Sequence, residues 1–195
     1  MSHPQSTVHV VGPNDPIPAE AILVNTTSRS TTWSRALSPF LLGPVRLYDD
    51  HVAQNVENAW QYSKVYPAHA DPAGEPTAAY FSWAERGWNS VRAHRYPMGK
   101  GARPLFSYWA GQKLSYVEAR KRIYVPLYAA AVQRTAAFRQ LRALHSRGIV
   151  LCLWDFDAYA HLALDRTLDQ VLHDPSRKMG HAFVLAMLLE GHLPT

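Results

Sequence analysis

The sequence predicts an α+β fold, organised as a single helix-rich domain with a small sheet. Two observations predict this class: long segments carry helix caps and stops, and short apolar runs stand between turn residues. The 195 residues are 47% hydrophobic and 18% charged, which excludes a disordered chain and allows one sizeable core. We expect residues 21–195 to form this domain, and residues 1–20, which contain four prolines, to form a flexible N-terminal arm.

Turn and cap signals define the expected elements. Ser115 and Glu118 have the spacing of a capping box, so a helix should begin at Tyr116. Pro126 should kink or split this helix, and Gly148 should end it. Other segments with a helical pattern cover residues 53–66, 77–93 and 180–190. Apolar runs predict strands over residues 21–24 and 149–154.

The charge and the cysteine content limit the partners and the compartment. A formal net charge of +5 favours anionic partners such as nucleic acids or nucleotide phosphates. The lone Cys152 excludes a disulfide framework and fits a reducing compartment. The N-terminus lacks the basic start and apolar block of a signal peptide, and no apolar stretch is long enough to span a bilayer. We therefore expect a cytoplasmic protein without a membrane partner.

Residues 55–64 contain the most informative polar cluster. On a helix, Glu57, Gln61 and Lys64 fall at positions i, i+4 and i+7 and share one face, while Trp60 belongs to the packing side. An acid, an amide and an ammonium group together form a compact polar cluster that a core does not need. The alternative is a solvated helix face with a weak charge pair.

A basic segment lies at residues 92–104. Its small residues let the backbone approach a ligand, and its Arg and Lys side chains offer charge-assisted hydrogen bonds to phosphate. It is not a P-loop, because Gly99-Lys100-Gly101 lacks the upstream glycine and the following Ser or Thr. The alternative is a solvated basic turn. Trp109, farther along, would either stack on a base or ribose or belong to the core.

Two acids follow the predicted strand at 149–154. Asp155 and Asp157 would share a side and face a ligand, because the carboxyl end of a strand often borders a crevice. With His161 nearby, a metal site is a minority interpretation, since the histidines show no zinc-type pairing with cysteine. We expect neither a metal nor a cofactor.

The order of these segments resembles the NADAR superfamily, the YbiA-like N-glycosidases associated with NAD and ADP-ribose metabolism. The similarity spans residues 37–191, and Asn58 stands where the family has a His. The family's helix with Glu, Gln and Lys resembles residues 56–64, and its arginine and Met-Gly stretch resembles residues 95–99. The acidic strand end and the last glycine segment also have counterparts. The residues that carry the resemblance are Val56, Glu57, Gln61, Lys64, Arg95, Met98, Gly99, Pro104, Trp109, Asp155, Asp157 and Gly180.

The resemblance implies a YbiA-like α+β fold and hydrolysis of the N-glycosidic bond of an ADP-ribosyl or ribosyl-phosphate substrate. An ADP-ribosylated nucleobase in DNA is one candidate. A carboxylate beside C1 of ribose would stabilise the positive charge that builds up there and would activate water. Glu57 and Asp155 are the candidate catalytic residues, and the division of roles between them stays open. The candidate substrate-binding residues are Lys64, Arg95, Met98, Gly99, Lys100, Arg103, Trp109, Asp157 and Gly180.

Two other classes of function compete with this interpretation. A binding module would hold ADP-ribose or nucleic acid without turnover. An Asp-nucleophile phosphatase would use Asp155 and Asp157 at the end of an apolar strand. That scheme normally starts near the N-terminus, and here only about forty residues follow the first acid, so we rank it last.

Overall fold

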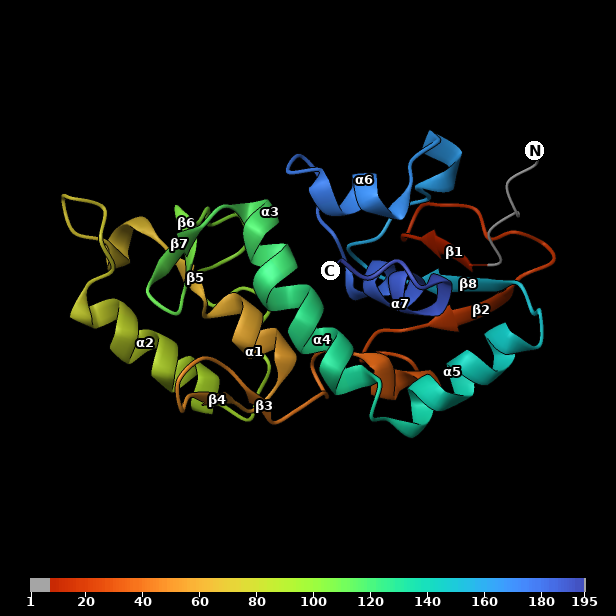
Figure 1. Cartoon of the computed structure of the whole chain (residues 1–195), viewed down its shortest axis with the longest axis horizontal. Coiled ribbons are helices and arrows are strands. Elements are labelled where there is room, and N and C mark those ends of the chain that lie inside the picture. Colours follow the sequence, from red (N-terminus) through yellow and green to blue (C-terminus); the bar gives the residue numbers. More distant parts are fainter. Residues whose placement is uncertain (1–7, 195) are drawn as a thin grey trace. The chain divides into compact units, whose positions relative to one another are not determined.

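The computed structural model describes residues 8–194, which divide into two compact units. Residues 8–38 and 128–194 form one, called here the terminal unit, and residues 39–127 form the other, the central unit. Helices and short strands occur in both (Figure 1), which confirms the α+β class. The sequence predicts one domain for residues 21–195 and does not anticipate this division.

The terminal unit is built on a parallel sheet of three strands. These are β1 (Val8–Val11), β2 (Ile22–Asn25) and β8 (Leu151–Trp154), in the order β1-β8-β2. The predicted strands at 21–24 and 149–154 are thus confirmed as β2 and β8. Strand β8 lies between the other two, which explains why its sequence is a continuous apolar run.

Strand β1 corrects the expected N-terminal arm. The sequence places Val8–Val11 in this arm, but three of these four residues are buried and all four pair with β8. A chain partner more than 140 positions away supplies the hydrogen bonds. The run Val8–Val11 is rich in β-branched valine, a strand signal that the nearby prolines outweigh in the sequence-based prediction. Residues 1–7 of the expected arm lie outside the described residues.

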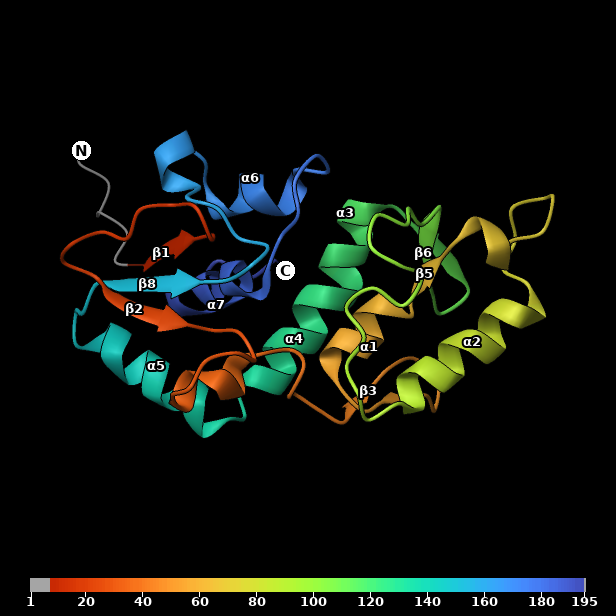
Figure 2. The same cartoon turned by 180° about the vertical axis from the view of Figure 1, so that it is seen from behind.

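Helices surround this sheet and complete the core of the terminal unit. Helix α7 (His181–Glu190) packs against β1 and β8, beside which it lies in both views (Figures 1 and 2), and its residues His181 to Met187 are all buried. The predicted helix over 180–190 is therefore confirmed. The remaining helical segments are η1 (Trp33–Leu37), α5 (Ala136–Ser146), η4 (Leu162–Leu164) and α6 (Leu168–His173).

The central unit contains two small antiparallel sheets and several helices. One sheet pairs β3 with β4, and the other has the order β5-β6-β7. The strands are β3 (Val45–Arg46), β4 (Val52–Ala53), β5 (Lys64–Val65), β6 (Phe106–Trp109) and β7 (Gln112–Leu114). The helices are α1 (Val56–Gln61), η2 (Pro67–His69), α2 (Ala78–Asn89), α3 (Tyr116–Ala119) and the π-helix η3 (Arg120–Tyr124). The boundary between the units falls inside α4 (Val125–Val132).

Helix α1 is shorter than the predicted helix over residues 53–66. It begins where the Asn55 side chain accepts a hydrogen bond from the Asn58 backbone, and it ends at Gln61. Tyr108 then donates its backbone N–H to the Ser63 carbonyl, which draws the chain into the sheet of β5 and β6. Lys64 is consequently a strand residue, and its expected place on the face of a long helix is wrong.

The segment after Ser115 follows the prediction at its start. Ser115 and Glu118 form the capping box, and the helix begins at Tyr116. The irregularity near Pro126 is a π-helix that precedes it, in which Val125 donates to the carbonyl of Arg120. This longer spacing accommodates a proline that has no N–H to donate. The helix continues through Pro126 as α4.

Candidate functional site

Glu57, Gln61 and Lys64 form a connected polar chain in the central unit. The Gln61 amide donates to Glu57 Oε1 at 2.8 Å, and its oxygen accepts from Lys64 Nζ at 2.7 Å. Lys64 Nζ also lies 4.6 Å from the centre of the Trp60 ring. The sequence therefore predicts the contact although it assigns Lys64 to the wrong element. Glu57 is only 6% exposed, which excludes the alternative of a solvated helix face.

The burial of Glu57 follows from how α1 is anchored. Val56 and Ala59 of this helix are completely buried, and the Glu57 backbone donates to the Pro39 carbonyl. A carboxylate held in such a place needs hydrogen-bond donors, and the Gln61 amide provides one. The amide thus fixes the acid on one side and the ammonium group on the other.

Asn58 organises the basic segment, a role that the sequence analysis missed. Its Nδ2 donates to the carbonyls of Ser90 and Arg92, both at 2.9 Å, and its Oδ1 accepts from the His94 backbone at 2.9 Å. Tyr62, just after α1, adds a hydrogen bond of 2.7 Å between its hydroxyl and His94 Nδ1. Four hydrogen bonds from the α1 region therefore hold the backbone and one side chain of residues 90–94 in place.

This segment surrounds an open hollow of about 450 Å³. Tyr62 and residues 92–97 line it, so Arg95 is a lining residue as the prediction of a binding role requires. Met98, Gly99, Lys100 and Arg103 follow in the chain and are not lining residues. Gly99 has a φ of 93° with open space around its Cα, which shows that this glycine serves a turn.

The sequence allows Trp109 either to stack on a ligand or to belong to the core, and the structure places it in the core. Its indole in β6 is partly buried and packs against the apolar cluster of Leu114, Ala119 and Ile123. The Tyr48 ring meets it edge-on, with ring centres 4.9 Å apart. These contacts explain its position through packing alone.

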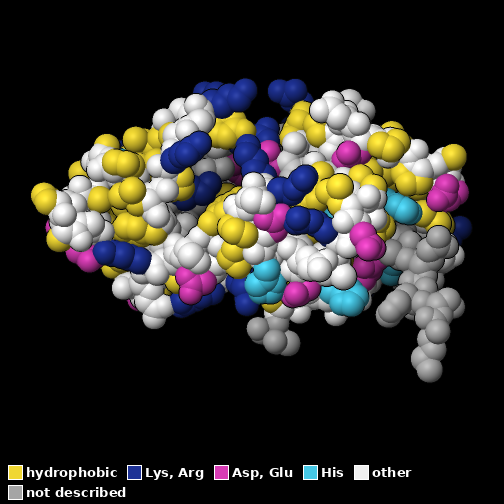
Figure 3. All heavy atoms as spheres, turned by 90° about the horizontal axis from the view of Figure 1, so that it is seen from above, with side chains coloured by type: hydrophobic (Ala, Val, Ile, Leu, Met, Phe, Trp, Pro, Cys, Tyr) yellow, Lys and Arg dark blue, Asp and Glu magenta, His cyan; other side chains and the backbone are white. Residues whose placement is uncertain are grey.

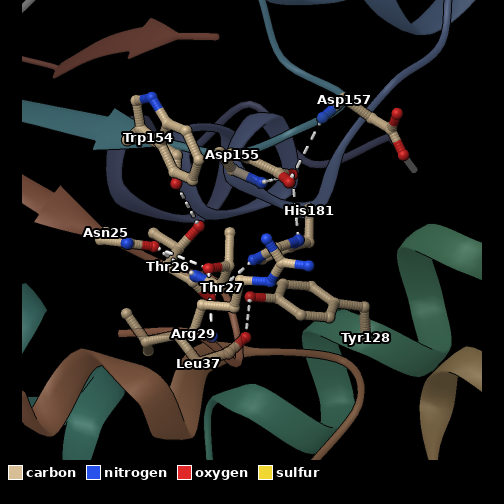
Figure 4. A network of polar contacts seen from close by, with 11 residues as sticks. Asn25, Thr26, Thr27, Arg29, Leu37, Tyr128, Trp154, Asp155, Asp157 and His181 are labelled. Carbon is tan, nitrogen blue, oxygen red and sulfur yellow. Dashed lines mark hydrogen bonds and ion pairs between the residues drawn. The ribbon is translucent and has the colours of Figure 1, made fainter. Parts of the chain in front are cut away.

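Asp155 is the centre of a polar network in the terminal unit (Figure 4). It directly follows β8 and is 5% exposed. Its Oδ2 lies 3.0 Å from His181 Nδ1 and accepts from the Ala182 backbone at 3.4 Å, while Oδ1 accepts from the Asp157 backbone at 3.4 Å. His181 Nε2 lies 2.8 Å from the Thr26 carbonyl oxygen. The first turn of α7 is thus fastened to the ends of both β8 and β2.

The geometry around His181 defines where its protons are. The Thr26 carbonyl can only accept, so Nε2 carries a hydrogen. Burial alone raises the pKa of the Asp155 carboxyl, but the His181 charge and hydrogen bond, with the backbone donors of Ala182 and Asp157, outweigh it and lower this pKa. With Nδ1 facing Asp155 Oδ2 at 3.0 Å, the two residues form a buried histidine–carboxylate pair.

Gly180 and Asp157 adjoin this pair. A Cβ on Gly180 would clash with Asp155 Oδ2 and lie 2.8 Å from Asp155 Cγ, so the glycine is needed for packing. Its N–H donates to the Asp157 carbonyl at 3.1 Å. The Asp157 side chain forms an ion pair of 3.3 Å with Lys178. The structure therefore brings together the three predicted site residues of the terminal unit.

The predicted site residues are distributed over the two units. Glu57, Lys64 and Arg95 belong to the central unit, and Asp155, Asp157 and Gly180 belong to the terminal unit. That Glu57 and Asp155 share one cleft stays a prediction. Within residues 8–194, no group of three or more His, Cys, Asp or Glu side chains is placed to hold a metal ion. No helix in the same range is long and apolar enough to cross a membrane.

Comparison with known proteins assigns a family. No curated protein and no solved structure matches the chain significantly. A family model described as a family of unknown function, DUF6939, matches residues 14–185, most of the chain. The chain therefore belongs to this family of unknown function, DUF6939.

Proposed function

We propose that the protein is an N-glycosidase that hydrolyses the bond between ribose C1 and a nitrogen in an ADP-ribosyl or ribosyl-phosphate substrate. The observation that carries the proposal is the buried Glu57, bonded to Gln61, whose amide oxygen in turn accepts from Lys64. The same three residues carry the resemblance to the NADAR superfamily. We include a cytoplasmic location in the proposal, because the single cysteine is unpaired.

The reaction suits a carboxylate in such an environment. When the C1–N bond breaks, positive charge develops on the ribose ring, and a fixed negative charge beside C1 lowers the energy of that state. Glu57 would also take a proton from the attacking water, whose oxygen forms the new bond to C1. The departing nitrogen takes up a proton from solvent, and Glu57 returns its proton to solvent, so that the products are a free ribosyl sugar and a base or amine.

The residues around Glu57 have supporting roles in this scheme. The Gln61 amide orients the carboxylate, and the Lys64 ammonium group offers donors to ribose hydroxyl or phosphate oxygens. Arg95 would hold a phosphate, because it lines the same hollow as Tyr62 and guanidinium groups bind phosphate. The substrate would be ADP-ribose-like or a nucleotide, with modified DNA among the candidates.

Glu57→Gln tests the proposal. We expect a loss of release of base or amine on the order of a hundredfold or more, because glutamine keeps the size but removes the charge that the reaction requires. Each protein would be incubated with candidate ribosides, including ADP-ribosylated DNA, and the released base or amine would be measured by chromatography. Glu85→Gln, on the exposed face of α2, is the matched control and should turn over normally.

The outcomes separate catalysis from binding. A thermal melt of each variant distinguishes loss of the reaction from loss of the fold. Turnover at the wild-type rate by folded Glu57→Gln would remove this residue from the mechanism. If the wild type releases nothing from any riboside yet binds ADP-ribose in calorimetry, the protein is a binding module.

A further inference from the structure

The hollow lies in a stretch of the chain that is rich in positive charge. Residues 86–117 contain six of the 20 Lys and Arg residues and none of the 15 Asp and Glu residues. The segment therefore carries +6, and residues 119–154 continue the basic stretch with seven more Lys and Arg residues and no acid. Figure 3 shows one face of the molecule, on which basic and acidic side chains lie among hydrophobic ones.

Among the described residues, at least three of these six cations have no acidic partner. Lys113 forms an ion pair with Glu75, which accounts for one of the six cations. Within residues 8–194, Arg92, Lys100 and Arg103 form no ion pair with an Asp or Glu side chain. A cluster of cations without acids repels itself, and binding of an anion relieves this repulsion.

The backbone of the residues that line the hollow is also preorganised. Asn58 is completely buried, and its three hydrogen bonds hold the backbone at Ser90, Arg92 and His94. A loop that merely carries solvated charges has no need of a buried amide beneath it. Because the backbone is already ordered, a ligand loses less conformational entropy in this loop when it binds.

The lining combines cations with aromatic rings. Arg95 lies over the ring of Tyr96, 5.3 Å from its centre, and Tyr96 is 41% exposed. Tyr62 and His94 form the other aromatic part, joined by their hydrogen bond. Guanidinium groups bind phosphate, whereas exposed aromatic faces stack on nucleobases. The hollow, about 450 Å³, is too large for a single phosphate and lies within the usual range of ligand pockets.

We infer that Tyr62 and residues 92–97 form a binding site for a phosphate group with an adjoining nucleobase. The inference goes beyond the proposed reaction, because it depends on Arg92, His94 and Tyr96 and requires no turnover. Arg92 and Arg95 contact the phosphate, and the Tyr96 ring stacks on the base. Two ligands offer this chemistry, a free nucleotide and a single-stranded nucleic acid, and Lys100 and Arg103 extend the basic segment for the longer one.

Fluorescence anisotropy tests the site with two labelled probes, AMP and a single-stranded oligodeoxynucleotide. We expect Tyr96→Ala to weaken binding about 5- to 100-fold through loss of stacking. Arg92→Ala should lower the slope of log affinity against log salt by about 0.7, as loss of one phosphate contact does. Both side chains are exposed, so the variants should fold. Arg142→Ala, an exposed arginine on α5, is the control and should leave affinity and slope nearly unchanged.

Each outcome decides the matter. If the wild type binds both probes with equal affinity and Tyr96→Ala weakens this binding, the ligand is a free nucleotide. Much tighter binding of the oligonucleotide, with the same sensitivity, identifies the nucleic acid. The inference is overturned if the wild type binds neither probe, or if Arg142→Ala weakens binding as much as Arg92→Ala and Tyr96→Ala do.

Discussion

Asp155→Asn tests whether the buried pair with His181 stabilises the terminal unit. Asparagine keeps the shape of the side chain but removes the negative charge that faces His181 Nδ1. Removing one partner of a buried ion pair costs about 3–5 kcal/mol, because the other charge stays buried without compensation. Both side chains are 6% exposed, so solvent screens little of this effect. The loss is a large part of the 5–15 kcal/mol of a typical domain, roughly a third.

The pH dependence of this loss has a defined sign. The pKa of Asp155 is lower in the folded protein than its usual value. Its contribution is therefore fully present above about pH 4, the unfolded value, and is lost as pH falls through the folded pKa. The difference in unfolding free energy between wild type and variant should accordingly be largest near neutrality and narrow in acid.

Urea denaturation, followed by circular dichroism at pH 6 and at about pH 2, measures both effects. Asp157→Asn is the matched control on the same loop. Its ion pair with Lys178 is largely solvated, with side chains 31% and 61% exposed, so it should cost less than about 1 kcal/mol. If Asp155→Asn costs no more than Asp157→Asn at pH 6, the pair does not stabilise the fold and our account of His181 is wrong.

Two further predictions concern buried positions. His161 is 3% exposed, and burial, with a smaller contribution from the His9 charge, lowers its pKa to about 4. Because the pKa of histidine in the unfolded chain is about 6.5, the unfolding free energy of the wild type should fall by up to about 3 kcal/mol between pH 6.5 and 4. His161→Phe should abolish this part of the pH dependence of the unfolding free energy, measured by urea titration. An unchanged pH dependence in the variant would contradict the prediction. Gly180→Ala should cost about 3 kcal/mol through its clash with Asp155, whereas Gly74→Ala, in open space with φ of 79°, should cost about 1 kcal/mol. Equal losses in the two alanine variants would show that the clash is relieved without cost.

The elements that the sequence predicts are those with local signals. The capping box at Ser115 and Glu118 uses residues three positions apart, and the apolar run of β8 reports burial on both faces of the sheet. Strand β1 has only a weak signal of this kind, four valine-rich residues beside a proline-rich stretch, and its pairing with β8 comes from far along the chain. The β6–β7 hairpin was also missed, although Ala110 and Gly111, both at positive φ, form its turn.

The contacts of the candidate site also divide into those with a local signal in the sequence and those between distant positions. Glu57 and Gln61 are one helical turn apart, so their contact follows from helix geometry. His181 reaches Thr26 across 155 positions, and nothing in either local sequence indicates the pair. In the sequence, Asn58 stands out only as a difference from the NADAR pattern that the chain resembles, because its partners lie 32 to 36 positions away in a loop without regular structure.

The surroundings of the two acids favour different roles for them in the proposed reaction. A general base must gain a proton near neutral pH, and Asp155 is unsuited to this because its pKa is lowered and both of its oxygens accept hydrogen bonds within the terminal unit. Such a group is a fixed negative charge that orders the start of α7. Glu57 accepts a hydrogen bond from the amide of Gln61, which orients its carboxylate. If both acids serve one reaction, Glu57 is therefore the base and Asp155 the structural charge, and only Glu57→Gln should abolish turnover in a protein that still folds.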